Sequence, residues 1–156
     1  IGGSRYQNSH LFFRDGICWI LTLNENSEYL KARFRSAGVF DVNAMTIFLR
    51  DGRVTDKYVV CLLNSYLMFH FKKHFVNGTS AFQINDARQI PIKVPTDGEL
   101  TRFEDIFDRA VALKMIKVNT AEEGKEARKQ MEILQKDLDD QVFKLYGFEA
   151  SLFSRP

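Results

Sequence analysis

The sequence predicts an α+β domain, in which a small mixed or antiparallel sheet and a buried helix are followed by two long C-terminal helices. Short runs of aromatic and β-branched residues, separated by turn residues, fill the first 50 positions. A dense apolar run over 57–74 comes next, and apolar residues recur at helical spacing after 96. The chain has 156 residues, 45% of them hydrophobic, so it is long enough to bury a core of its own.

The first two strands are expected to form a hairpin. The runs 10–14 and 17–23 are rich in aromatic and β-branched residues. Asp15-Gly16 lies between them, and such a pair favours a two-residue hairpin turn.

A further strand is predicted over 43–50, where a second turn pair, Asp51-Gly52, ends it. The segment before it carries Lys31, Arg33 and Arg35 at alternate positions. An extended backbone would place these three side chains on one side, where they could contact DNA phosphates.

The run 57–74 is too rich in apolar residues for a surface helix and too long for a strand, which indicates a largely buried helix. It ends in Lys72-Lys73-His74, followed by Asn77-Gly78 as a stop. The two lysines have two interpretations, namely favourable interaction with the helix dipole and contact with phosphate. His70 and His74 have a spacing that could hold zinc, but no third ligand follows at ligand spacing, so no metal site is expected.

Residues 79–95 predict two short strands separated by a turn, because apolar and polar residues alternate around Phe82 and again around Ile92. Asn85-Asp86 is suited to capping a single helical turn between them. Proline cannot donate to a ladder, so the second strand should lie at an edge of the sheet.

The tail predicts two long helices. Thr96 or Asp97 can cap the first, a break is expected near 119–124, and Gly147 should close the second. The apolar residues of the two helices form stripes at helical spacing: Leu100, Phe103, Ile106, Phe107, Ala110 and Leu113, then Met131, Leu134, Leu138, Val142 and Leu145.

Charge divides the chain into two regions, 1–95 and 96–156, within one compact domain. The first has 12 Lys and Arg against 7 Asp and Glu, a net charge of +5, and the second has 10 against 13, a net charge of −3. This asymmetry suits a basic surface over 1–95 that faces a polyanion such as nucleic acid, joined to an acidic helical spacer over 96–156, although a charge separation of this size also occurs by chance.

Cys18 and Cys61 lie in apolar stretches and should be buried, reduced thiols. No apolar run approaches the roughly 20 residues that a membrane span requires. A cytoplasmic location is expected, and the start Ile1-Gly2-Gly3-Ser4 suggests an internal piece of a longer protein.

Several segments together resemble a known family. They are 62–65 (LLNS), 77–86 (NGTSAFQIND), 89–92 (QIPI) with Pro95, and 138–148 (LDDQVFKLYGF). In their order and spacing they resemble the C-terminal target-recognition domain of adenine-specific DNA methyltransferases of the type IIG restriction-modification class. Type I specificity subunits are less similar, because they continue from the Ile-Pro strand into a different helix start.

This resemblance implies a division of labour. The upstream methyltransferase domain of the same chain would bind S-adenosylmethionine, and a fused endonuclease, where present, would use Mg²⁺. The segment itself would hold no cofactor and no catalytic residue, and would bind double-stranded DNA. Lys31, Arg33, Arg35, Lys72 and Lys73 are the predicted phosphate contacts, and Gln83, Thr79 and Ser80 are the predicted base readers.

Two alternatives remain at this point. The helices could dock a partner subunit, with DNA bound elsewhere. A nuclease site built from Asp97 with Glu123-Gly124-Lys125 is disfavoured, because the second element lies in a polar helical stretch rather than on a buried strand.

Overall fold

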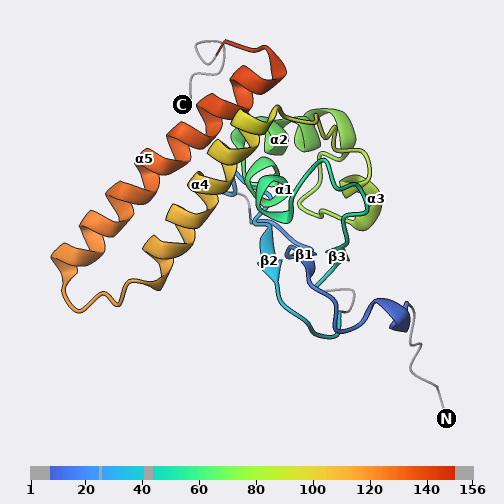
Figure 1. The fold of residues 1–156 in the computed structure, drawn as a ribbon, viewed down its shortest axis with the longest axis horizontal. Helices are drawn as coiled ribbons and strands as arrows, with labels where there is room; N and C mark the ends of the chain where they lie inside the picture. Colours follow the sequence, from blue (N-terminus) through green and yellow to red (C-terminus); the bar gives the residue numbers. More distant parts are fainter. Residues whose placement is uncertain (1–7, 25, 41–43, 150–156) are drawn as a thin grey trace.

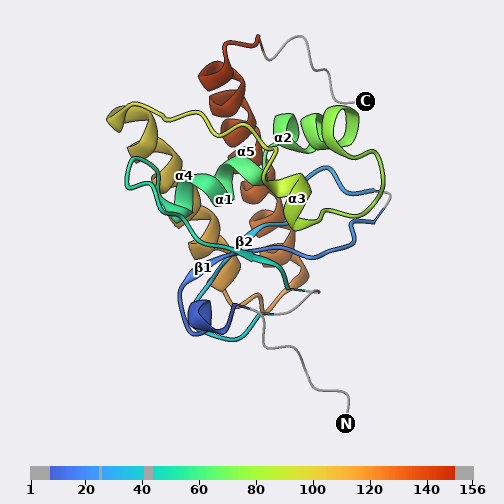
Figure 2. The ribbon, with the colours of Figure 1, turned by 90° about the vertical axis from the view of Figure 1, so that its right-hand side faces the viewer.

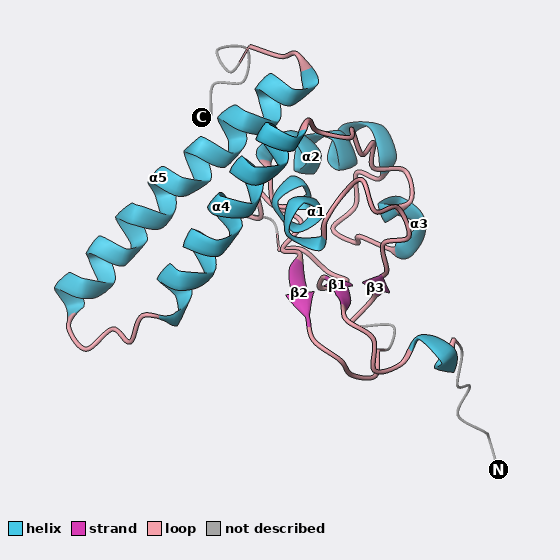
Figure 3. Ribbon diagram, viewed as in Figure 1, coloured by secondary structure: helices cyan, strands magenta, loops and turns pink. Residues whose placement is uncertain are grey.

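The computed structural model describes residues 8–24, 26–40 and 44–149, and it has the predicted α+β architecture (Figure 1). A small sheet and a group of short helices form a body from which two long helices project (Figure 3). The elements in chain order are η1 (Ser9–Leu11), β1 (Gly16–Cys18), β2 (Arg33–Arg35), β3 (Thr46–Ile47), α1 (Asp56–Leu63), α2 (Tyr66–Phe71), the π-helix η2 (Lys72–Val76), α3 (Ile84–Ala87), α4 (Asp97–Met115) and α5 (Ala121–Tyr146).

The sheet is antiparallel, with the strand order β2-β1-β3. The predicted hairpin over 10–23 is wrong, because Gly16 pairs with Arg35 inside the sheet and residues 9–11 form η1. A Cβ on Gly16 would lie 2.8 Å from the carbonyl oxygen of Ile47, so this glycine permits close strand packing rather than a turn. The strand expected over 43–50 is seen as β3 only, and residue 43 lies outside the described residues.

The apolar run 57–74 is mostly helical and largely buried, as predicted, but it is not one helix. It breaks between α1 and α2, where Ser65 caps α2 by accepting a hydrogen bond from the Met68 amide. The Asn64 side chain accepts from the backbone N–H of Ala32 at 2.9 Å and donates to its carbonyl oxygen at 2.7 Å. The break therefore attaches the two helices to the segment that enters β2.

The two strands predicted over 79–95 are not formed. Ala81 makes an isolated bridge with Thr22, and the single turn α3 follows where the Asn85-Asp86 pair predicted one. Residues 91–95 adopt no regular structure, but the chain is fixed there: the hydroxyl of Tyr58 donates to the carbonyl oxygen of Lys93 at 2.6 Å.

The tail forms the two long helices that were predicted, α4 and α5, and these run antiparallel to each other (Figure 1). Thr96 caps α4 by accepting from the Glu99 amide, and Gly147 ends α5 with a φ of 77°. The connection covers 116–120, slightly earlier than expected. The most deeply buried residues of the two stripes are Phe103, Ile106, Leu134, Leu138, Val142 and Leu145.

One hydrophobic core contains residues from both charge regions, from Ile17 and Trp19 in the first to Val142 and Leu145 in the second. Among the described residues, no helix is both long enough and apolar enough to cross a membrane.

Both cysteines are free and buried, which fits the prediction from their apolar flanks. Burial raises the pKa of the Cys61 thiol to about 12, so its thiolate is scarce at neutral pH. At pH 8 we expect Cys61 in the folded protein to react with a disulfide reagent about a thousandfold more slowly than an unfolded-state thiol with a pKa of about 8.5. Absorbance of the released thiolate, measured on a Cys18→Ala variant, checks this; equal rates before and after denaturation would contradict it.

The same shift has a consequence for stability. Cys61 has a higher pKa in the folded state than in the unfolded state, so its protonated form favours folding. This contribution is complete below a pH of about 8.5 and decreases as the pH rises towards 12.

Candidate nucleic-acid interface

Four of the residues predicted to bind DNA line one hollow at the end of η2. We call it the Lys73 hollow; its volume is about 260 Å³. Part of its lining belongs to the loop that leads from η2 towards α3, and Figure 2 shows the course of this loop. Its lining consists of Leu23, Asn24, Phe69, Lys72, Lys73, Gly78, Thr79 and Ser80.

The loop that forms one wall of this hollow is fixed by its own hydrogen bonds. The Asn77 side-chain oxygen accepts from the backbone N–H of Thr79 at 2.9 Å and from its hydroxyl at 2.7 Å. The Ser80 carbonyl oxygen accepts from the backbone N–H of Leu23 at 2.9 Å. The Thr79 hydroxyl therefore contributes to the loop itself, and this loop is presented in a defined conformation.

Lys72 has a structural role in the folded chain. Its side chain is 2% exposed, and its ammonium donates to the carbonyl oxygen of Thr79. Burial lowers the pKa of Lys72. Because this ammonium is enclosed and already bonded, we do not propose Lys72 as a phosphate contact.

Lys73 and Ser80 are exposed beside this buried lysine. An ammonium, a hydroxyl and the Asn24 amide are groups that proteins use to contact phosphate oxygens.

Gln83 stands at the start of α3, not on a strand. Its backbone N–H donates to the Asp86 carboxylate at 2.8 Å, and Asn77 donates to the same carboxylate oxygen at 3.1 Å. The next residue back, Phe82, is fully buried against Trp19. Gln83 is therefore not held on a strand as the sequence predicted, but its side chain is exposed.

The other predicted phosphate contacts do not line the hollow. Arg33 and Arg35 belong to β2, and Lys31 lies two residues before this strand. Lys31 has a φ of 53°, which interrupts the expected alternation, but both Lys31 and Arg33 are exposed. Arg35 is only partly exposed, and its guanidinium donates to the carbonyl oxygens of Gly38 and Val39 at 2.6 and 2.7 Å. Arg35 thus closes a local turn. Arg33 is exposed although its Nε donates to the Cys18 sulfur at 3.3 Å.

The two histidines at zinc-binding spacing stack on each other instead. Their ring centroids are 5.5 Å apart, and no group of three or more His, Cys, Asp or Glu in the described part of the chain could hold a metal ion. Burial, together with the charges of His74 and Lys73, lowers the pKa of His70. His70 is therefore mostly neutral at pH 7.

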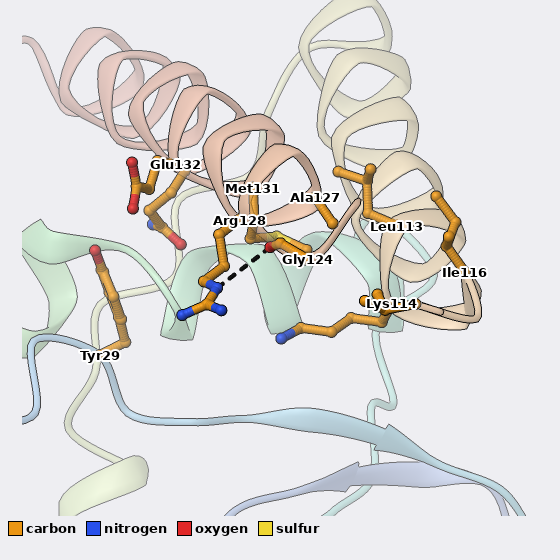
Figure 4. Close-up of a pocket in the computed structure, with 11 residues that line it drawn as sticks. Tyr29, Leu113, Lys114, Ile116, Gly124, Ala127, Arg128, Met131 and Glu132 are labelled. Carbon is orange, nitrogen blue, oxygen red and sulfur yellow. Dashed lines mark hydrogen bonds between the residues drawn. The ribbon is translucent and has the colours of Figure 1, made fainter. Parts of the chain in front are cut away.

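A second hollow, of about 530 Å³, lies at the free end of the α4 and α5 pair and was not anticipated from the sequence. Lys114 and Arg128 extend over the same open space, with Tyr29 on its other side (Figure 4). Large apolar side chains are exposed around this end of the helices, including Met115, Ile116 and Val118. Only the folded arrangement of two helices and a distant loop brings these residues together.

No protein-family model matches the chain, and no curated protein matches it either.

Proposed function

We propose that this chain is the target-recognition domain of a restriction-modification enzyme that methylates adenine in DNA. The domain binds double-stranded DNA and reads the target for a catalytic domain outside this chain. The observation that carries the proposal is the Lys73 hollow, in which the exposed Lys73 of η2 and the exposed Ser80 line one space, and Ser80 belongs to a loop that is fixed by its own hydrogen bonds.

Charge and geometry both support duplex DNA as the ligand. The region 1–95 has a net charge of +5, and its exposed cations include Lys31 and Arg33 as well as Lys73. Phosphate contacts of this kind position a protein on DNA, while base contacts specify the sequence. In the proposed parent protein, S-adenosylmethionine is bound by the methyltransferase domain, and Mg²⁺ is needed where an endonuclease is fused.

Replacing Lys73 with alanine is expected to weaken binding about equally on all duplex sequences, because a phosphate contact carries no sequence information. The slope of log affinity against log salt should also decrease by about 0.9, the value for one neutralised phosphate. Fluorescence anisotropy with two unrelated labelled duplexes, titrated at several salt concentrations, measures both effects.

Lys129→Ala is the matched control, since Lys129 is an exposed lysine of α5 remote from the Lys73 hollow. It should leave affinity and slope unchanged. If Lys73→Ala also changes neither, Lys73 only complements the end of the helix. If the unaltered chain shows no salt-dependent binding, the proposed function is wrong.

One observation favours a second candidate, a module that docks a partner subunit through its helices. Ile116 and Val118 line the hollow at the free end of α4 and α5, and they are 54% and 51% exposed. Exposed apolar surface of this kind is typical of protein interfaces. The same salt titration separates the candidates, because a docking module without a DNA surface has no salt-dependent affinity for a duplex.

A further inference from the structure

Three oxygen atoms in the lining of the Lys73 hollow already accept hydrogen bonds from the protein. The carbonyl oxygen of Thr79 accepts from a buried ammonium, and that of Ser80 accepts from a backbone N–H. The side-chain oxygen of Asn24 accepts from the hydroxyl of the buried Ser27 at 2.6 Å. These bonds use much of the capacity of the lining to accept hydrogen bonds from a ligand.

Donors of the same lining, in contrast, have no partner within the described ranges of the chain. They are the NH2 group of Asn24, the hydroxyl of Ser80 and the backbone N–H groups of Gly78 and Ser80. The ammonium of Lys73 is exposed and is likewise not bonded to any acceptor among the residues that the structure describes. Such donors bind water in the free protein, and a ligand that replaces this water must supply acceptors of its own.

The charge of the lining also favours an anion. Its charged residues are Lys72 and Lys73, and none of the described residues that form it is an Asp or a Glu. Asp86, the carboxylate that interacts with Lys72, lies outside the lining and accepts hydrogen bonds from Gln83 and Asn77. Cations and free donors around one concave space give it a positive potential.

We propose that the Lys73 hollow is an oxyanion pocket, which holds one phosphate group through the Lys73 ammonium, the Asn24 NH2 group and the donors of Ser80. A phosphate group supplies acceptor oxygens and negative charge, which is what a lining of free donors and cations can bind. A phosphate of the DNA backbone and a free phosphate ion share this chemistry. The inference rests on the proposed function, and it therefore assigns the hollow to a backbone phosphate.

The first test is a titration of the full chain with inorganic phosphate, followed by NMR of the amide signals. Sodium chloride keeps the ionic strength constant and serves alone as the reference. The backbone signals of Gly78 and Ser80 and the side-chain NH2 signals of Asn24 should shift along one saturable curve. Unchanged signals, or shifts equal to those with chloride alone, would overturn the pocket.

Asn24→Asp tests the donor set directly. It replaces the NH2 group with an oxygen atom of similar size and keeps the acceptor for Ser27. Phosphate should then bind at least about tenfold more weakly, because a hydrogen bond to a charged group is lost and a like charge is added.

Asn119→Asp is the matched control, since it makes the same change at an exposed residue of the connection between α4 and α5, outside the hollow. It should leave the affinity for phosphate unchanged. An unaltered affinity in Asn24→Asp, or equal weakening by both variants, would contradict the proposed donor set.

A labelled duplex of arbitrary sequence identifies the source of the phosphate group. If the DNA backbone fills the hollow, the duplex shifts the same amide signals, and inorganic phosphate competes with it at constant ionic strength. Salt-dependent binding of the duplex without these shifts or this competition would overturn the inference and still support the proposed function. Saturable binding of phosphate by a chain that does not bind the duplex would show a site for a free phosphate ion, and the proposed function would fail.

Discussion

Replacing Leu138 with alanine is expected to lower the free energy of unfolding by about 2 to 5 kcal/mol. Leu138 is 5% exposed on α5 and belongs to the single hydrophobic core. Its truncation removes buried apolar surface and leaves a cavity that the two packed helices cannot fully close. The next residue, Asp139, accepts from the Tyr66 backbone N–H at 2.7 Å, so α5 is held against α2 at this position and relaxation is limited.

Chemical denaturation of Leu138→Ala and of a control variant, compared with the unaltered chain, measures this loss. Ile133→Ala is the control, because Ile133 lies on the same helix but is 54% exposed. It should change stability by less than about 0.5 kcal/mol. A loss well below 1 kcal/mol for Leu138→Ala would mean that α5 is not part of the domain core in solution.

Replacing Phe82 with alanine is expected to cost about 3 to 5 kcal/mol, as is usual for a buried phenylalanine. Phe82 has no exposed surface, and its ring centroid lies 5.2 Å from that of Trp19. The Trp19 indole N–H donates to the Phe82 carbonyl oxygen at 2.8 Å, and the Phe82 N–H donates to the Leu21 carbonyl oxygen. Loss of the ring should therefore loosen the loop that forms the Lys73 hollow.

The neighbouring Gln83→Ala is the matched control for stability, since Gln83 is exposed and its backbone bond to Asp86 does not need the side chain. Thermal unfolding should separate the two variants clearly. If Phe82→Ala melts like Gln83→Ala, the loop is not anchored through Phe82. If the proposed function holds, Gln83→Ala can also be assayed in the proposed parent enzyme on a panel of single-base target variants. Relaxed discrimination at one position, by about 1 to 3 kcal/mol, would identify Gln83 as a base reader.

The helical tail was predictable from sequence because its signals are local. The Thr96 cap, the apolar stripes and Gly147 each act within a few residues of the helix that they define. The sheet was not predictable in the same way, since Gly16 has the local sequence of a turn but pairs with the distant Arg35. The break at Asn64 likewise depends on a partner, Ala32, that lies 32 positions away.

The predicted phosphate contacts include one buried lysine and one exposed lysine that are adjacent in sequence. The prediction gave Lys72 and Lys73 the same role because they are neighbours of the same residue type. Lys72 follows the buried Met68 by four positions, which places it on the inner face of the helix, and it is buried, whereas Lys73 is exposed. The hollow lined by Lys114 and Arg128 could not be anticipated, because the net acidic charge of the tail says nothing about which face of each helix its cations occupy.

The segment that joins the regions 1–95 and 96–156 is bonded to both of them, and these bonds limit how the two regions can move relative to each other. Besides its bond from Tyr58, it is held by the end of α5: the Tyr146 hydroxyl donates to the Pro91 carbonyl oxygen and accepts from the Lys93 N–H at 3.2 Å, and the Lys93 ammonium donates to the Leu145 carbonyl oxygen at 2.6 Å. Swinging the long helices about this segment would break these bonds together. We therefore expect the helix pair and the region 1–95 to move as one rigid unit, so that a torque applied at the free end of the helices rotates both together and does not bend this segment.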